Sequence, residues 1–320
     1  MGSKDSRVQS SHRLVAGYAT IGQGAGPMIV TERAGLFAKH GLQVQTRLMN
    51  GAKGVVQGLM NGEIQFGNLA APSLLRAGLM EGADLVFLTG GINQQFLMGR
   101  PGIKERQQLA GARIGLVGDA GLNDVLVYFV ADRLAKDGIQ NVRLVPVPGG
   151  GRESLARLIS RECDAVVITP PEAIEAKRQG CHFLVDFLHY GLNYALGGIA
   201  ARRRYLEGHE EIARRFVKAY LEGMHRYRVD RAFTVQVQQE YSGIADRSIA
   251  EETYDITRPG MPEVPYPVVR ALRTALEVMA RQLPPAATVD PRQFVDDRFI
   301  KELDESGFIA SLYKKTAENS

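Results

Sequence analysis

The feature that most constrains the fold is a repeated succession of short apolar runs, glycine-containing turns and amphipathic segments. The first series starts at Arg13, where RLVAGYAT predicts a strand and IGQGAGP a turn. MIVTERAGLFAKHG then predicts a helix that ends at Gly41. Strands that alternate with helices indicate parallel pairing through crossover helices, so the chain is expected to fold as an α/β protein.

The same succession continues to residue 91. LQVQTRLM alternates as a strand does, and EIQFGN and ADLVFLTGG are further strand candidates. The segments between them, NGAKGVVQGLMNG and LAAPSLLRAGLMEG, are expected to form a turn with a short helix and a longer helix. The first series therefore predicts one sheet with helices packed on it.

A second series follows the break at Arg100–Pro101–Gly102. Strands are predicted in ARIGLVG, VRLVPVP, DAVVIT and HFLVDF, with helical segments between them. The segment HYGLNYALGGIAARR then reads as an extended return to the first series. From Tyr205 onward the chain is mostly helical, with apolar residues at helical spacing. These residues are Ile212, Phe216, Val217, Tyr220, Leu221 and Met224.

This order predicts two α/β lobes that the chain connects twice. Lobe 1 is expected to comprise residues 13–99 and 198–320, with the C-terminal helices completing it, and lobe 2 residues 100–197. Residues 1–12 are expected to be a flexible N-terminus. Each lobe would hold a mixed, mainly parallel sheet flanked by helices. Ligands bind outside the carboxyl ends of such strands, and here two such edges could face each other across a cleft.

Composition excludes several classes of protein. Of the 320 residues, 45% are hydrophobic and 23% charged, which is typical of a globular protein. The net charge of +4 comes from interspersed acids and bases, so nucleic acid is not an expected partner. No apolar run is long enough to span a membrane. Cys163 and Cys181 each precede a predicted strand, and free thiols are favoured over a disulfide between them.

No constellation of catalytic or metal-binding residues can be identified. The six histidines are scattered without H-x-x-H spacing, and no G-x-S-x-G occurs. The turn at Thr20–Gly24 lacks the spacing of a nucleotide-binding G-x-G-x-x-G motif. Asp119 and Asp124 could pair, but helix-cap and surface roles explain them more simply. We therefore expect no metal and no cofactor, and the pattern favours binding over catalysis.

Four segments carry a resemblance to a known family. They are the run from VTERAGLFAKHGLQVQTRLMNG to NGEIQFGNLAAPSLLRAG, LAGARIGLVGDAGLNDVLVYFVADRLAKDGI, SRECDAVVITPPEAIEAKRQG and the tail DPRQFVDDRFIKELDESGFIASLY. The chain resembles the solute-binding proteins of ABC importers of the sulfonate, nitrate and taurine type, within the NMT1/thiamin-pyrimidine-synthase-like superfamily. The likeness extends from Arg13 to Tyr313. It implies a two-lobed type II periplasmic-binding-protein fold.

The resemblance implies a monomer that captures a small anionic or heteroaromatic molecule in the cleft between the lobes by hinge closure. It would then deliver this ligand to the permease subunits of an ABC importer. The alternative is a cytosolic enzyme on the same fold, such as a decarboxylase, a desulfinase or a thiamin-pyrimidine-precursor synthase-like protein. The cysteine-rich motif of the thiamin-pyrimidine synthases does not occur here. The N-terminus as written is polar and unlike a secretory signal, so we expect a periplasmic location if a signal peptide was removed and a cytoplasmic one otherwise.

Candidate ligand-binding residues lie at the turns that follow strands and in the return segment. Helix N-termini at such turns favour anions, although a plain tight turn explains the glycines equally well. Asn68 could bind a ligand or cap a helix. Arg152 could bind a carboxylate or sulfonate bidentately or point into solvent, and Tyr194 could stack on a ligand or pack in the core. The full set is Ile21, Gly22, Gln23, Gly51, Ala52, Asn68, Ala70, Asp119, Ala120, Gly121, Gly149, Arg152, Thr169, Asn193 and Tyr194.

Overall fold

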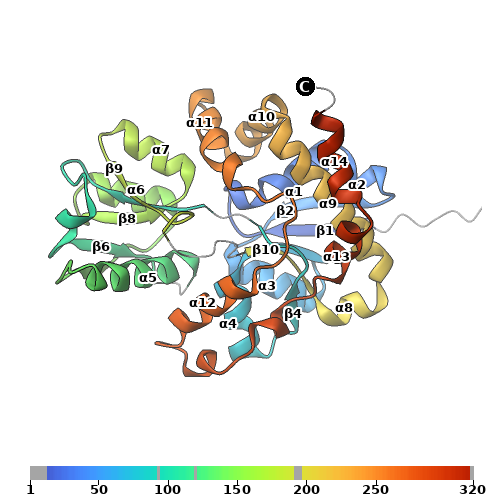
Figure 1. Cartoon of the computed structure of the whole chain (residues 1–320), viewed down its shortest axis with the longest axis horizontal. Coiled ribbons are helices and arrows are strands. Elements are labelled where there is room, and N and C mark those ends of the chain that lie inside the picture. The colour runs from blue at the N-terminus through green and yellow to red at the C-terminus, as the bar shows by residue number, and fades with distance from the viewer. Residues whose placement is uncertain (1–12, 92–93, 119–120, 191–196, 318–320) are drawn as a thin grey trace, which may run out of the picture.

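Two five-stranded sheets, each flanked by helices, form the two halves of the molecule (Figure 1). This computed structural model describes residues 13–91, 94–118, 121–190 and 197–317. The predicted α/β class with two type II periplasmic-binding-protein-like lobes is confirmed. Within the described ranges, no helix is both long and apolar enough to cross a bilayer.

The first sheet has the order β2-β1-β3-β10-β4. Strand β1 pairs in parallel with β2 and β3, and β10 runs antiparallel between β3 and β4. The return segment therefore inserts a late strand into a sheet built from early ones. The strands are β1 (Arg13–Tyr18), β2 (Gln43–Leu48), β3 (Phe66–Ala70), β4 (Leu85–Phe87) and β10 (Gly197–Arg202).

The second sheet repeats this plan with the order β7-β6-β8-β5-β9. Strand β6 pairs in parallel with β7 and β8, and β5 runs antiparallel to β8 and β9. The strands are β5 (Phe96–Gly99), β6 (Arg113–Leu116), β7 (Arg143–Pro146), β8 (Ala165–Ile168) and β9 (His182–Asp186).

The helices of the two series cover the sheets and begin where the strands end. In the first lobe they are α1 (Gly26–Arg33), α2 (Leu36–Lys39), α3 (Gly51–Asn61) and α4 (Ala71–Glu81), preceded by the short 3-10 helix η1 (Gln23–Ala25). In the second lobe they are the 3-10 helix η2 (Arg106–Leu109), α5 (Leu122–Lys136), α6 (Gly151–Ile159) and α7 (Pro170–Arg178).

The C-terminal third is helical and packs mainly on the first lobe. Helix α9 lies against α1 and α2, and its Phe216 stacks on Phe66 of the first sheet with ring centroids 3.8 Å apart. Helices α11 and α12 also reach the second lobe, where they contact α7 and α5 respectively (Figure 1). The helices are α8 (Arg203–Gly208), α9 (Glu210–Val229), α10 (Arg231–Ser242), α11 (Arg247–Thr257), α12 (Val269–Met279), α13 (Arg298–Glu305) and α14 (Phe308–Ala317), with 3-10 turns η3 (Arg258–Gly260), η4 (Pro284–Ala287) and η5 (Pro291–Phe294).

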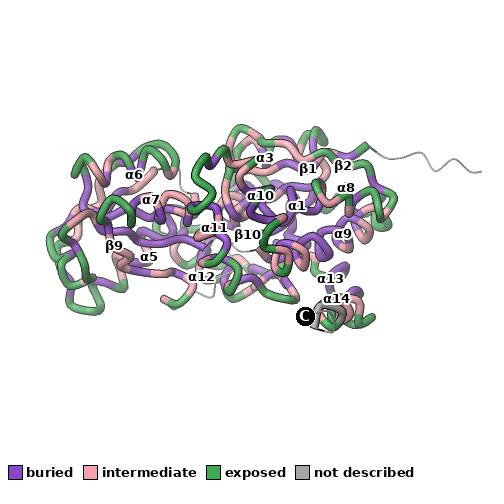
Figure 2. The backbone as a smooth tube through the Cα atoms, turned by 90° about the horizontal axis from the view of Figure 1, so that it is seen from above, coloured by how far each residue is buried: buried purple, intermediate pink, exposed green. Residues whose placement is uncertain are grey.

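Burial follows this layering, with the sheets inside each lobe and exposed turns at the outer ends (Figure 2). The periodic apolar residues predicted on α9 form its buried face, apart from the half-buried Ile212. Both cysteines are free and buried in the core of the second lobe, as the sequence favoured.

Three local predictions were wrong. The segment predicted as one helix from Met28 to Gly41 is interrupted at Gly35, whose φ of 67° ends α1 and starts α2. Asn68 lies inside β3, which continues to Ala70, so Asn68 does not cap a helix. Strand β5 was not predicted, because its residues FLMG lead directly into the break at Arg100–Pro101–Gly102 and were assigned to the connecting segment.

The position of β5 bears on where the lobes divide. This strand precedes Arg100 but pairs within the second sheet. We propose that the two lobes follow the two sheets, with the first crossing ending before Phe96 and with residues 198–320 belonging to the first lobe. Residues 1–12 lie outside the described part of the chain.

The first crossing between the lobes touches the start of β10 at two glycines. A Cβ built on Gly91 would lie 3.2 Å from the Cα of Gly198, and one on Gly198 would overlap the carbonyl oxygen of Thr89. Leu88 N–H donates to the Ile199 carbonyl oxygen at 2.8 Å, so the contact extends into the first sheet. The first crossing and β10 are therefore in backbone contact, and side chains are excluded between them.

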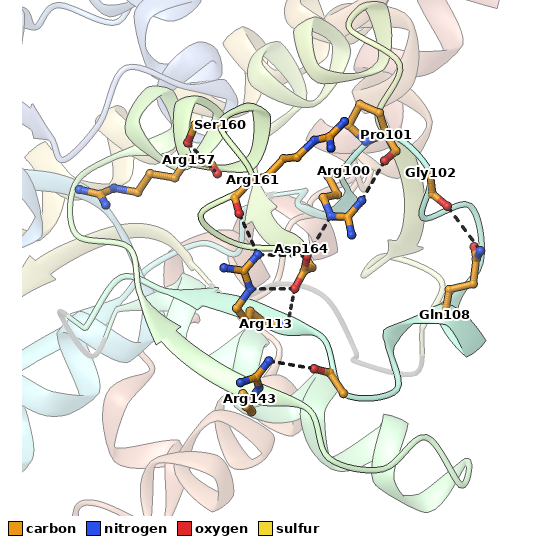
Figure 3. A network of polar contacts seen from close by, with 11 residues as sticks. Arg100, Pro101, Gly102, Gln108, Arg113, Arg143, Arg157, Ser160, Arg161 and Asp164 are labelled. Carbon is orange, nitrogen blue, oxygen red and sulfur yellow. Dashed lines mark hydrogen bonds and ion pairs between the residues drawn. The ribbon is translucent and has the colours of Figure 1, made fainter.

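A buried carboxylate ties the second lobe together where it begins. Asp164 precedes β8 and accepts hydrogen bonds from Arg100 Nε at 2.8 Å and from Arg113 N and Nε at 2.9 and 3.0 Å (Figure 3). Arg113 starts β6 and Arg100 follows β5, so one side chain links three segments of the sheet.

Candidate functional site

A cavity of about 280 Å³ lies between the lobes and is lined by both of them. The first lobe contributes the segments that follow β1 and β3, and the second lobe those that follow β6 and β8. The first crossing contributes Gly91 and Gln95, and the start of β10 contributes Gly197 and Gly198. This cavity, called the main cavity below, lies at the sheet edges where ligands bind in such folds.

Helix N-termini form much of the wall of the main cavity. Helices α3 and α4 start at it from the first lobe, and α5, α6 and α7 from the second. The residues that precede α3, α4 and α5 provide no side-chain cap. The first N–H groups of a helix have no partner within it and carry partial positive charge, so they can donate to a ligand.

Glycines let the backbone adopt these turns. Gly51 has a φ of 65° and Gly149 a φ of 114°, conformations that other residues rarely adopt. A Cβ at Gly149 would also lie 2.8 Å from the side chain of Glu153. The glycine-containing turns therefore bring main-chain groups to the cavity wall.

The structure brings most of the sequence-predicted site residues to this cavity. Gln23 and Arg152 do not line it but line an adjoining cavity. Four others, Asp119, Ala120, Asn193 and Tyr194, lie outside the described residues. Those that line the main cavity are Ile21, Gly22, Gly51, Ala52, Asn68, Ala70, Gly121, Gly149 and Thr169.

Arg152 is placed differently from the cation expected in the cleft. Its side chain is 63% exposed, and its Nη1 lies 3.6 Å from Glu175 Oε2. Among the described residues that line the main cavity, Glu172 is the one with a charged side chain, and its Oε2 accepts a 2.6 Å hydrogen bond from Thr169 Oγ1. The cleft therefore offers neutral groups and helix N-termini where a guanidinium was expected.

Asp124, which the sequence analysis considered together with Asp119, is buried. Its interpretation as a surface charge was therefore wrong. It is 3% exposed, and both of its oxygens accept from Gly118 N at 3.0 Å. It thereby fixes the turn before α5. Asn123 beside it donates from Nδ2 to the Val167 carbonyl oxygen at 3.1 Å, which holds the start of α5 against β8.

Sequence reasoning missed Gln95. This residue is 2% exposed and lines the main cavity, and its Oε1 has no hydrogen-bond partner among the described residues. An unpaired buried acceptor is unfavourable unless a guest supplies a donor. The available signal was the polar pair Gln94–Gln95 directly before an apolar run, but it indicates no particular role by itself.

The adjoining cavity has a volume of about 270 Å³. It is lined by η1, α6 and α7 and by the C-terminal helices α10 and α11, and we call it the side chamber. Its wall includes Gln23 and Arg152. The side chamber and the main cavity share four lining residues, Ile21, Gly22, Gly151 and Glu172.

Metal and thiol chemistry find no support in the described part of the molecule. No group of three His, Cys, Asp or Glu side chains there could hold a metal ion. Neither cysteine lines the main cavity or the side chamber. Burial, reinforced by the neighbouring charge of Asp164, raises the pKa of Cys163 to about 11, which disfavours its thiolate.

Comparison with known proteins agrees with this geometry. The model of the NMT1/THI5-like family matches residues 24–229. No curated protein matches the chain. The computed structure is similar to the periplasmic aliphatic sulphonate-binding protein SsuA from Escherichia coli, with a TM-score of 0.71 and 18% identity over 90% of this chain and 92% of that one.

Two further solved structures share the fold. The periplasmic nitrate-binding protein NrtA from Synechocystis PCC 6803 has a TM-score of 0.75 and 12% identity, covering 93% of this chain and 89% of its own. The desulfurization enzyme DSZB has a TM-score of 0.69 and 16% identity, covering 91% of this chain and 98% of its own. At these sequence identities the likeness shows a shared fold alone.

Proposed function

Because the chain belongs to the NMT1/THI5-like family, we propose that it is a solute-binding protein that captures a small organic anion in the main cavity and delivers it to an ABC importer. The observation that carries the proposal is one cavity lined by helix N-termini from both lobes. The likeness to sulphonate- and nitrate-binding proteins supports the same role.

Capture follows from the way the two lobes share the cavity. Ligand contacts from both lobes exist together when the lobes are closed, so a ligand has higher affinity for the closed form. Binding then shifts the population toward that form. The closed form would be the one that the permease subunits recognise, on the extracytoplasmic side of the membrane and with the binding protein as a monomer.

The charge of the ligand is proposed from the wall of the cavity. Helices α3, α4 and α5 direct their N-termini to it, whereas Glu172 lies in the first turn of α7 and offsets the N-terminus of that helix. No aromatic ring lines the cavity in the described part of the chain. We therefore favour an anion bound by main-chain N–H groups over a heteroaromatic ligand bound by stacking. A cavity of this size suits a small molecule.

The enzyme alternative has no comparable observation in its favour. The fold is shared with DSZB at 16% identity, and fold alone does not carry an activity. Recovery of the bound compound in unchanged form, checked by NMR, would distinguish binding from turnover.

Titration calorimetry with a panel of anions tests the proposal. The panel is acetate, butanoate, methanesulfonate and butane-1-sulfonate, at constant ionic strength. Ala52 lies in the first turn of α3 at the cavity wall, where an aspartate suits the helix but repels a bound anion. We expect Ala52→Asp to bind the best anion at least about tenfold more weakly than Ala52→Asn, a difference of about 1.4 kcal/mol.

Ala52→Asn is the matched control, because it adds about the same volume without the charge.

Small-angle scattering tests closure of the lobes: the wild-type protein should show a smaller radius of gyration with the anion bound than without it. Equal affinity of the two variants, or no binding of any panel member by the wild-type protein, would overturn the proposed anion site.

A further inference from the structure

The side chamber concentrates buried polar atoms that have no partner. Gln23 is 5% exposed, and neither its Oε1 nor its Nε2 has a hydrogen-bond partner in the described structure. Gln238 Oε1 and Thr253 Oγ1 are also unpartnered, on residues that are 3% and 2% exposed. Seven buried side-chain atoms of this kind occur among the described residues, and four of them belong to these three side chains of one cavity wall.

Such atoms are unfavourable in an empty cavity. A buried donor or acceptor without a partner costs about 1–3 kcal/mol, so a concentration of them indicates a guest that supplies the missing partners. Gln238 is already oriented, because its Nε2 donates to Tyr227 Oη at 2.5 Å and leaves Oε1 as the free acceptor. The wall therefore offers acceptors on Gln23, Gln238 and Thr253 and donors on Gln23 and Thr253.

The charges around the chamber favour a neutral guest. Glu153 and Glu172 contribute two carboxylates, against the one guanidinium of Arg152, which faces Glu175. Backbone N–H groups of Glu153 and Gly150 donate to Glu153 and lower its pKa, so this carboxylate is ionised at neutral pH. A second anionic group would meet net negative charge here, whereas a neutral group with both donors and acceptors would not.

The chamber adjoins the main cavity at Gly22. Tyr241 donates from its hydroxyl to the Gly22 carbonyl oxygen at 3.1 Å, and Gly22 lines both cavities. Burial raises the pKa of Tyr241, so the hydroxyl keeps the proton that it donates. Gln23, the next residue, carries the two unpartnered amide atoms. One ligand could therefore extend from the main cavity past Gly22 to Gln23.

We propose that the side chamber is a second subsite that takes a neutral amide-type group, such as a primary carboxamide, of the ligand whose anionic end occupies the main cavity. This inference rests on the proposed function. The carboxamide of Gln23 presents one donor beside one acceptor, and another amide can form two hydrogen bonds with that pair. The ligand class is thus a carboxylate or sulfonate with a distal carboxamide, lactam or urea group.

Matched ligand pairs test the subsite. Succinamate, glutaramate and adipamate carry a carboxylate and a primary amide, and levulinate, 5-oxohexanoate and 6-oxoheptanoate replace the amide NH₂ group by CH₃. We expect the wild-type protein to bind the best amide of the series at least about tenfold more tightly than its ketone partner, because the ketone leaves the chamber acceptors unpaired. Calorimetry at constant ionic strength measures both affinities.

Two variants assign this preference to the chamber. Gln23→Leu should reduce it to less than about threefold, and Thr253→Val should lower it as well. Both replacements remove unpartnered polar atoms, so neither is expected to unfold the protein, and thermal unfolding checks this. Gln236→Leu is the control, since Gln236 is an exposed glutamine on α10 that is bonded to Glu240 outside the chamber.

The outcomes separate this inference from the proposed function. Equal affinity for amide and ketone, or an amide preference that persists in Gln23→Leu, overturns the subsite and leaves the anion site intact. Binding of an anion of the first panel but of neither longer series also overturns it. If no anion of the first panel and no member of either series binds, the anion site and the subsite are both overturned.

Discussion

Asp164 is the residue on which the second lobe depends most clearly. Burial alone would raise its pKa, but the hydrogen bonds from Arg113 and Arg100 outweigh burial and hold the pKa well below its usual range. Its side chain is 12% exposed, so solvent screens these bonds only in part. Since the folded-state pKa lies below the unfolded value, the network stabilises the fold above the unfolded pKa of about 4. This stabilisation is lost as the pH falls toward the folded value.

We expect Asp164→Asn to lower the free energy of unfolding by about 2 kcal/mol at pH 7, because two arginines lose a charged acceptor. Below about pH 4 the difference between wild type and variant should shrink, since the Asp164 carboxyl of the unfolded wild-type chain becomes protonated there while that of the folded protein stays ionised. Urea unfolding at pH 7 and pH 3 measures both effects. Asp137→Asn, at a more exposed ion pair with Arg106, is the control. A difference that does not change with pH would show that the charge of Asp164 is not the cause.

The two thiols allow a second test at the residue scale. Burial raises the pKa values of Cys163 and Cys181, in the case of Cys163 to about 11. A thiol reagent such as DTNB attacks the thiolate, so native protein at pH 8 should react at least about 100-fold more slowly than unfolded protein. Both thiols should titrate in guanidinium chloride. One rapidly reacting thiol in the native protein would contradict the burial described for that residue.

The residues of the site show how far sequence patterns reach. The turns at Gly51 and Gly149 could be predicted, because glycine followed by a helical segment specifies a local backbone conformation. Gln95 and Thr253 could not, because their importance depends on a missing hydrogen-bond partner, which is a property of the folded surroundings. For Arg152 the sequence left open a side chain in the cleft and one in solvent, because its place in the first turn of a helix does not fix the direction of the side chain, which is 63% exposed in the structure.

At the scale of elements, α11 and α12 connect the lobes from two sides. Arg178 at the end of α7 donates from Nη1 to Asp246 Oδ2 at 2.7 Å and from Nη2 to Ser248 Oγ and Glu252 Oε1 at 2.8 and 2.5 Å. From the other side, Arg281 bonds Asp132 of α5. Both sets of bonds form between lobes, so they stabilise the arrangement of the lobes in this structure.

We expect Arg178→Ala to favour the open form. Loss of the Arg178 side chain removes contacts between the lobes, so the ligand-free protein should show a larger radius of gyration. Because less of the protein is then in the closed form, anion affinity should fall by a factor of about three. Scattering and calorimetry measure these quantities. Arg247→Ala is matched to it, because Arg247 pairs with Glu251 within α11 itself. Equal behaviour of the two variants would exclude a role of the α7–α11 contact in closure.

The elements themselves were largely predictable, in contrast to their contacts. Alternating and apolar runs predicted most strands, and amphipathic spacing predicted α5 and α9. Strand β5 escaped because it leads directly into the break at Arg100–Pro101–Gly102 and therefore resembles part of the connection. The contact of α11 with α7 escaped because it depends on exposed ion pairs between distant segments, for which a single sequence carries no signal.

At the scale of the whole molecule, the order of the two series predicted the two-lobed fold, and the resemblance of four segments predicted the family. The position of the main cavity follows from the rule that ligands bind at the carboxyl ends of strands. The side chamber follows from no such rule. Five elements from three parts of the chain meet there, and its polarity comes from which side chains remain unpaired.

The meeting of Gly91 with Gly198 has a kinetic consequence. Where the first crossing meets β10, backbone packs on backbone, so bending there changes φ and ψ angles without disturbing interlocked side chains. The barrier to separating the lobes should therefore contain little side-chain repacking at the hinge. Solute release would then be limited by contacts in the cleft and along α11 and α12, and those surfaces, more than the hinge, would set the residence time of the bound solute.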